Sequence, residues 1–148
     1  MAFHFSLQAV LRFRESFERR ECMRLQVITR EVAKTRQEWE EAKQDRATAS
    51  EQFTMKLKSG VAAMEIQFEQ ACDRSRLRRI AALKEQSEKL EDLRRRQMGV
   101  YTKAQQQRKI LENLRDRQLA IYRLEQSRRT QQQMDEMFLL RRASHEVP

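Results

Sequence analysis

The chain has 148 residues, of which 36% are charged and only 39% are apolar, and it contains two glycines and one proline. This composition argues against a single globular core and favours long solvated helices of the coiled-coil type, with disorder as the alternative. We favour helices because the apolar residues recur at helical spacing and runs of Pro, Gly or Ser are absent.

The first helix is expected to begin near residue 6. Residues 3–8 alternate in polarity like a strand, but the spacing of Leu7, Val10 and Leu11 is helical. Ser6 fits the N-cap position, with Phe5 as its hydrophobic flank. We therefore predict a first helix over residues 6–58.

A seam with alternating steps of three and four residues begins at Leu25. Such a spacing, sustained for about four repeats, is typical of a coiled coil. Trp39 lies on this seam and needs a small residue opposite, which an antiparallel turn at residue 60 would place near Ala81 and Ala82. The seam comprises Leu25, Ile28, Val32, Thr35, Trp39, Ala42, Arg46, Ala49 and Phe53.

One good turn signal follows the first helix, at Ser59-Gly60. Glycine at this point suits the left-handed conformation that ends many helices. Residues 61–68 are compatible with a helix, and the stretch 59–73 is predicted as a turn or tip that contains either a short helix or a loosely ordered segment.

A second helix is predicted over residues 74–142, within a single coiled-coil unit that spans residues 1–148. Gly99 lies inside it and is tolerated at a cost of about 1 kcal/mol relative to Ala. Its seam comprises Leu77, Ile80, Leu83, Ser87, Leu90, Arg94, Gln97, Tyr101, Ala104, Arg108 and Leu111, and it then moves to Ile110, Leu114, Arg117, Ile121 and Leu124.

The two predicted helices differ in length. A turn at residue 60 pairs residue 7 with about residue 113, so the end of the second helix extends beyond the first by roughly 40 Å. A lone helix is weakly stabilised in water, and the apolar run Met137–Leu140 calls for a partner. Two alternatives remain open, a partner groove and packing back onto Phe3, Phe5 and Leu7.

The net charge of +9 permits nucleic acid, an anionic membrane surface or an acidic protein as a partner. Two arginine clusters stand out, residues 74–79 and 94–96, but carboxylates lie within a turn or two of them. The simpler interpretation is therefore a solvated face with i,i+4 ion pairs.

No pattern of catalytic or cofactor-binding chemistry is present. Cys22, Cys72, His4 and His145 have no metal-ligand spacing, and the two thiols are expected to be small apolar fillers in a reducing compartment. The sequence contains no phosphate-binding glycine loop and no Ser or Thr with a nearby His. We expect no enzymatic activity, cofactor, metal, signal peptide or membrane span.

Both ends of the chain carry recognisable motifs. The first is residues 3–15, Phe-His-Phe-Ser-Leu-Gln-Ala-Val-Leu-Arg-Phe-Arg-Glu. The second is Leu114-Arg-Asp-Arg-Gln118, followed by Tyr122-Arg123 and Gln133-Met-Asp-Glu-Met137. They resemble the N-terminal and C-terminal signatures of the FliJ family of flagellar export proteins. The resemblance covers the whole chain and implies a long antiparallel two-helix hairpin, similar to the stalk of rotary ATP synthases.

The resemblance also implies a function and partners. FliJ-like proteins insert the end that bears both termini into the hexameric export ATPase (FliI), reach the export gate (FlhA) and escort export chaperones. They act in the cytoplasm at the inner face of the membrane, without enzymatic activity. Carried onto this sequence, the ATPase-facing end includes Phe3, Phe5, Leu7, Leu11, Arg117, Arg123, Met134, Met137 and Phe138, and the alternative for these residues is mutual packing of the helix ends.

The gate contact of the family cannot be matched residue by residue. Ile66 and Phe68 follow the turn, but residues 42–49 carry no tyrosine. Two other functions compete with the flagellar stalk: a nucleic-acid-binding coiled coil that uses the arginine clusters, and the equivalent stalk of a virulence secretion system.

Overall fold

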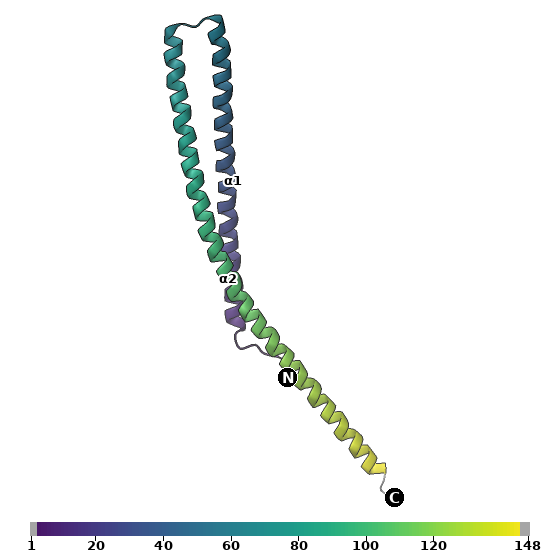
Figure 1. Cartoon of the computed structure of the whole chain (residues 1–148). Helices are drawn as coiled ribbons and strands as arrows, with labels where there is room; N and C mark the ends of the chain where they lie inside the picture. Colours follow the sequence, from purple (N-terminus) through teal and green to yellow (C-terminus); the bar gives the residue numbers. More distant parts are fainter. Residues whose placement is uncertain (1–2, 146–148) are drawn as a thin grey trace. The chain divides into compact units, whose positions relative to one another are not determined.

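The computed structural model describes residues 3–145, and two α-helices contain nearly all of them. Helix α1 spans Gln8–Ser59 and helix α2 spans Ala63–His145, and no strand occurs within the described residues (Figure 1). The prediction of an all-α antiparallel hairpin with a longer second helix is confirmed. Contacts divide the chain into two compact units: unit 1 is Met1–Glu18 with Lys103–Pro148, and unit 2 is Arg19–Thr102. The prediction of a single coiled-coil unit stays a prediction.

Helix α1 begins at Gln8, two residues later than expected. Residues 6 and 7 form a turn, in which the Gln8 amide donates to the Phe5 carbonyl at 3.1 Å. Ser6 therefore precedes the helix and is not its N-cap. The turn lets the chain fold back so that the side chain of Phe5 is buried.

The connection between the helices is shorter than the predicted tip. Gly60 has φ of +89°, and its amide donates to the Leu57 carbonyl at 3.3 Å, as expected for a left-handed residue that ends a helix. The amides of Glu65 and Ile66 both donate to the Ala62 carbonyl, and α2 begins at Ala63. The placement of residues 63–73 in a tip was therefore wrong: they are helical, and α2 runs to His145 rather than to residue 142.

We expect Gly60→Ala and Gly99→Ala to have opposite effects on the free energy of unfolding. At Gly60 an added Cβ meets nothing within 4 Å, so the loss of about 1 kcal/mol comes from the positive φ alone. At Gly99, inside α2, there is equal space and no positive φ, so Ala stabilises by about 0.5–1 kcal/mol. Urea unfolding of both variants measures this difference, and equal effects at the two sites would contradict the turn geometry.

In unit 2 the two helices run side by side in opposite directions (Figure 1). The α1 seam contains the buried side chains of Val32, Thr35 and Ala42. Apart from Leu77, the other apolar members in this unit are half-buried: Leu25, Ile28, Trp39, Ala49 and Phe53 in α1, and Ile80, Leu83, Leu90 and Tyr101 in α2.

The seam assignment of Leu77 was wrong, because its side chain is exposed and Arg76 is half-buried in its place. Leu77, Ile80 and Leu83 are separated by two successive steps of three residues. A seam has an average step of 3.5 residues, so two short steps in a row place Leu77 away from the seam. Counting back from Ile80 by four leads to Arg76.

The small residue that faces Trp39 is Ser87. Both residues line the same groove, and Ser87 is buried, whereas Ala81 and Ala82 are exposed. The expected pairing with these alanines was therefore wrong by about one and a half turns. The indole Nε1 of Trp39 is buried without a hydrogen-bond partner among the described residues, and the Lys43 ammonium lies 3.9 Å from the ring centroid.

In unit 1 the seam of α2 does not shift after Leu111 as predicted. Its half-buried residues continue as Arg115, Leu119 and Tyr122. The expected new seam is exposed along its whole length, at Ile110, Leu114, Arg117, Ile121 and Leu124.

Candidate protein-binding surfaces

The N-terminal segment packs against α2 within unit 1. The rings of Phe3 and Tyr122 have their centroids 5.7 Å apart at an angle of 50°. Phe5 is buried, Leu11 has 0% of its surface exposed, and Phe3 and Phe5 line a groove together with Arg115 and Leu119. Mutual packing of the helix ends therefore accounts for Phe3, Phe5 and Leu11.

The remaining residues of the predicted ATPase-facing end are accessible. Met134, Met137 and Phe138 have exposed fractions of 64%, 58% and 67%, and the neighbouring Leu139 and Leu140 are equally exposed. Leu7, Arg117 and Arg123 are exposed as well. The expected end thus separates into a packed part around Phe5 and Leu11 and a solvent-accessible part on α2.

The two alternatives for the extension of α2 can now be compared. Residues 3–5 pack back on α2, but only as far as Tyr122. Within the described residues no second helix lies beside the C-terminal part of α2, drawn in yellow-green and yellow (Figure 1). No other segment among residues 3–143 therefore covers the apolar side chains within residues 134–140.

An ionic cluster joins the helices in unit 1. The Arg108 guanidinium donates to the Glu18 carboxylate of α1 and also pairs with Glu112 of α2, and the three side chains are 13–31% exposed. The hydrogen bonds to Glu18 and then to Glu112 raise the pKa of Arg108. One turn away, Arg14 donates to the Gln107 side chain at 2.6 Å.

A buried carboxylate marks the seam of unit 2 at Glu21, which is 2% exposed. Gln97 donates from its amide to Glu21 Oε2 at 2.6 Å, and Arg24 lies 3.0 Å from Oε1. The hydrogen bond from Gln97 is the main reason that the pKa of Glu21 is lowered. The contact between Glu21 and Gln97 disfavours other registers of the two helices, because a shift of one helix along the other would leave the Glu21 carboxylate buried and unpaired.

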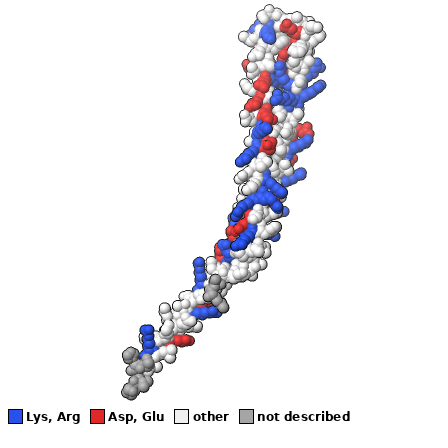
Figure 2. Space-filling model, turned by 180° about the vertical axis from the view of Figure 1, so that it is seen from behind, with Lys and Arg blue, Asp and Glu red and all other residues white. Residues whose placement is uncertain are grey.

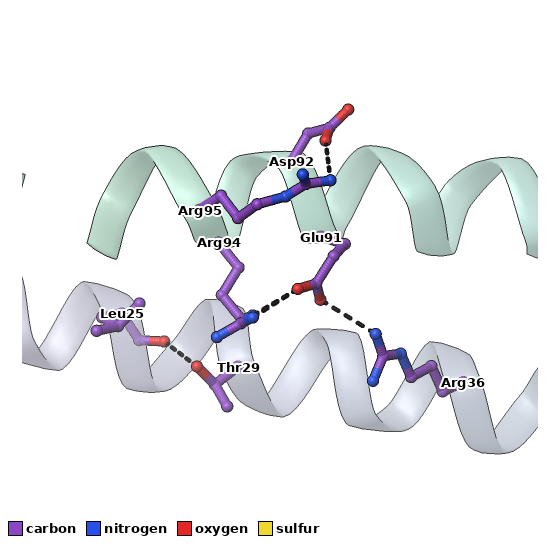
Figure 3. Close-up of polar contacts among 7 residues, drawn as sticks. All are labelled: Leu25, Thr29, Arg36, Glu91, Asp92, Arg94 and Arg95. Carbon is purple, nitrogen blue, oxygen red and sulfur yellow. Dashed lines mark hydrogen bonds and ion pairs between the residues drawn. The ribbon is translucent and has the colours of Figure 1, made fainter. Parts of the chain in front are cut away.

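Further inter-helix ion pairs lie closer to the loop. Figure 3 shows Glu91 of α2 between Arg94 of the same helix, at 2.5 Å, and Arg36 of α1, at 3.3 Å. Arg46 binds Asp73 with two bonds, of 2.7 and 3.1 Å. The bond from Arg94 lowers the pKa of Glu91, and the bond from Arg46 lowers that of Asp73.

Three arginines of the two clusters form ion pairs within α2. Arg94 pairs with Glu91, Arg95 with Asp92 at 2.7 Å, and Arg76 with Glu69 at 2.6 Å. Figure 2 shows Lys and Arg side chains interspersed with Asp and Glu along the visible face. On this face the interspersed charges do not form the continuous basic stripe that favours binding of a phosphate backbone.

The structure shows no arrangement for chemistry within the residues it describes. No group of three or more His, Cys, Asp or Glu residues there could hold a metal ion, and Cys22 and Cys72 are half-buried free thiols. Neither described helix combines the length and the apolar character needed to cross a membrane.

The residues near the loop between the helices are both polar and apolar. A groove near the loop is lined by Arg46, Ser50, Phe53 and Asp73 among others. Ile66 is half-buried and Phe68 is exposed. A gate-contact patch cannot be derived from these residues alone.

Comparison with known proteins gives one positive result. The family model described as "Flagellar FliJ protein" matches residues 3–146, which is nearly the whole chain. Neither the comparison with curated proteins nor that with solved structures gave a significant match. The match covers the residues that form the helical hairpin, and the chain therefore belongs to the flagellar FliJ family, as a coiled-coil protein related to flagellar export.

Proposed function

We propose that this protein is the non-enzymatic stalk of the flagellar type III export apparatus. In this role the end that bears both termini inserts into the hexameric export ATPase, and the hairpin couples the ATPase to the export gate. Membership of the FliJ family and the exposed apolar end of α2 support the proposal.

The observation that carries the proposal is the solvent exposure of the apolar side chains of α2 beyond Tyr122. Residues 125–133 are almost entirely polar, and residues 134–140 then present Met134, Met137 and Phe138 to solvent. A helix without tertiary packing has little stability of its own in water, and a cluster of large exposed apolar side chains marks an interaction site. A protein cavity that encloses this helix would bury the cluster and stabilise the helix together.

The proposal extends to the other members of the apparatus. We infer that the gate is contacted by the hairpin away from the termini, and that export chaperones are bound and escorted by the same protein. The protein acts in the cytoplasm and is peripheral to the inner face of the membrane through its partners. Membership of the family supports these roles, without assigning them residues.

The test removes the apolar cluster at the end of α2. We expect the triple variant Met134→Ser, Met137→Ser, Phe138→Ser to bind the purified export ATPase at least tenfold more weakly than the unmodified protein, measured by surface plasmon resonance. The reason is that the exposed apolar anchors supply most of the burial in the complex.

A matched control is available at the other end of the hairpin. Met55, Met64 and Phe68 have the same residue types and exposures of 67%, 81% and 70%. Their replacement by Ser should leave ATPase binding unchanged, and circular dichroism should show equal helicity for both triple variants. Unchanged ATPase binding by the Met134, Met137, Phe138 variant would refute the proposed insertion.

A further inference from the structure

Unit 1 carries an exposed apolar surface that is separate from both the seam and the end of α2. On α1 the exposed residues are Val10 and Phe13, and the Phe13 ring is 61% exposed and stacks against Phe17 at 6.4 Å between centroids. On α2, Ile110 is 66% exposed and Ile121 is 58% exposed. We call this surface the flank face; it comprises Val10, Phe13, Ile110, Leu114, Ile121 and Leu124.

Five residues of the flank face lie on the same side of the hairpin: Val10, Phe13, Ile110, Leu114 and Ile121. Val10 and Phe13 each immediately precede a residue of the α1 seam, Leu11 and Arg14. Ile110, Leu114 and Ile121 likewise each precede a half-buried seam residue of α2. In two helices that face each other and run in opposite directions, the residues that precede the seam fall on the same side of both helices.

Printed contacts agree with this geometry. The bond from Arg14 to Gln107 connects the two helices on this side, because Gln107 precedes the seam residue Arg108. In unit 2, Arg36 and Glu91 each follow a seam residue, and they pair with each other across the helices. Residues that precede the seam on one helix therefore lie on the same side as residues that precede the seam on the other helix.

The opposite side of unit 1 has a different chemistry. The residues that follow seam positions there are mostly charged: Arg12, Glu15, Lys109, Glu112 and Asp116. A solvated helix surface needs charges of this kind, and the flank face replaces them with large apolar side chains. This one-sided pattern is unexpected for a surface that contacts only water.

The spacing of the flank face matches that of a helix-packing seam. On α2 the row runs through residues 103, 107, 110, 114, 117, 121 and 124, in alternating steps of four and three. From Ile110 to Leu124 the row is about 21 Å long, which is about four helical turns. On α1, Val10, Phe13 and Phe17 have the same alternation, so the two rows form the walls that a third helix packs between where α1 lies beside α2. The α2 row continues alone beyond the start of α1, through Ile121 and Leu124.

The charges in these rows have one sign. The α2 row contains Lys103 and Arg117 and no carboxylate, and neither cation has an ion pair among the residues that the structure describes. The α1 row, at residues 10, 13 and 17, is uncharged. A second copy of this chain would bring Lys103 and Arg117 against the same cations, so electrostatics disfavour self-association through this surface.

We propose that the flank face is a docking site for an amphipathic α-helix of another protein, with apolar residues in steps of three and four and acidic residues beside them. The helix packs between α1 and α2 as the third member of a local three-helix coil, and its carboxylates pair with Lys103 and Arg117. This proposal does not depend on insertion into the ATPase, because the site is complete in the isolated hairpin.

The test uses two designed helical peptides of three heptads, with identical Leu and Ile seams and with either Glu or Lys at every flanking position. We expect the full chain to bind the Glu peptide at least tenfold more tightly than the Lys peptide, measured by fluorescence anisotropy. Equal affinity for the two peptides would overturn the proposal.

Two variants locate the binding on the flank face. Phe13→Ser with Ile121→Ser should weaken binding of the Glu peptide at least tenfold, whereas the matched exposed pair Phe68→Ser with Leu57→Ser should leave it unchanged. Lys103→Glu with Arg117→Glu should reverse the preference toward the Lys peptide. Unaltered binding by the Phe13, Ile121 variant, or a dimer in sedimentation equilibrium that this variant abolishes, would show that the assigned occupant is wrong.

Discussion

Leu11→Ala should lower the free energy of unfolding of unit 1 by about 2–5 kcal/mol, the usual range for truncating a fully buried leucine. Leu11 has 0% of its surface exposed, and few other side chains in this unit are buried. Little core is available to fill the cavity, because the other buried apolar side chains described in this unit are Phe5 and Ala104. Urea unfolding and hydrogen exchange measure the loss.

Two neighbouring substitutions control for general effects of the change. Leu11→Met conserves volume and should cost less than about 1.5 kcal/mol. Val10→Ala, at an exposed position on the adjacent flank, should change stability by less than about 0.5 kcal/mol. Hydrogen exchange in Leu11→Ala should accelerate in residues 8–18 more than in residues 25–53, because the cavity lies in unit 1. A loss below about 1 kcal/mol would contradict the packing described for Leu11.

Arg108→Leu should destabilise the protein by about 1–3 kcal/mol. The substitution removes the shared partner of Glu18 and Glu112, two partly buried carboxylates, and leaves them unpaired beside each other. Unfolding by urea at pH 7 measures the change.

A second substitution distinguishes a charge effect from a loss of packing. Adding Glu18→Leu to Arg108→Leu replaces the inter-helix pair with an apolar one, and this change should recover most of the lost stability. If the double variant is less stable than Arg108→Leu alone, the prediction that Glu18→Leu recovers stability is wrong. The ionic cluster would then contribute net stability beyond the avoidance of unpaired charge.

The long-range features of the fold could be predicted because they depend on local properties of the sequence. A chain with Gly60 as its one good turn signal and with almost no proline can reverse direction in few places, and the steps of three and four from Leu25 to Phe53 indicate one buried row. The register of the two helices was harder to predict, because one helix can shift along the other without changing the apolar spacing within either helix. The predicted register was wrong for Trp39, because its neighbour Ser87 is polar and gives no apolar signal in the sequence.

The candidate site was predicted only in part, for a physical reason that Ile110 and Leu111 illustrate. Two apolar rows run next to each other in this part of α2, and periodicity cannot tell which of them faces α1. The row of Ile110 was predicted as the continuing seam, but the N-terminal segment packs on Arg115, Leu119 and Tyr122 instead.

The sequence by itself determined that the chain forms two unequal antiparallel helices joined at Gly60, because helix formation and its interruption depend on residues close together along the chain. Only the tertiary structure decided which apolar side chains are buried. Burial depends on the rotation of each helix against the other and on where residues 3–7 fold back, and both follow from contacts between residues about a hundred positions apart. Those contacts buried Phe5 and Leu11 and left Phe13, Ile121 and Phe138 exposed to solvent.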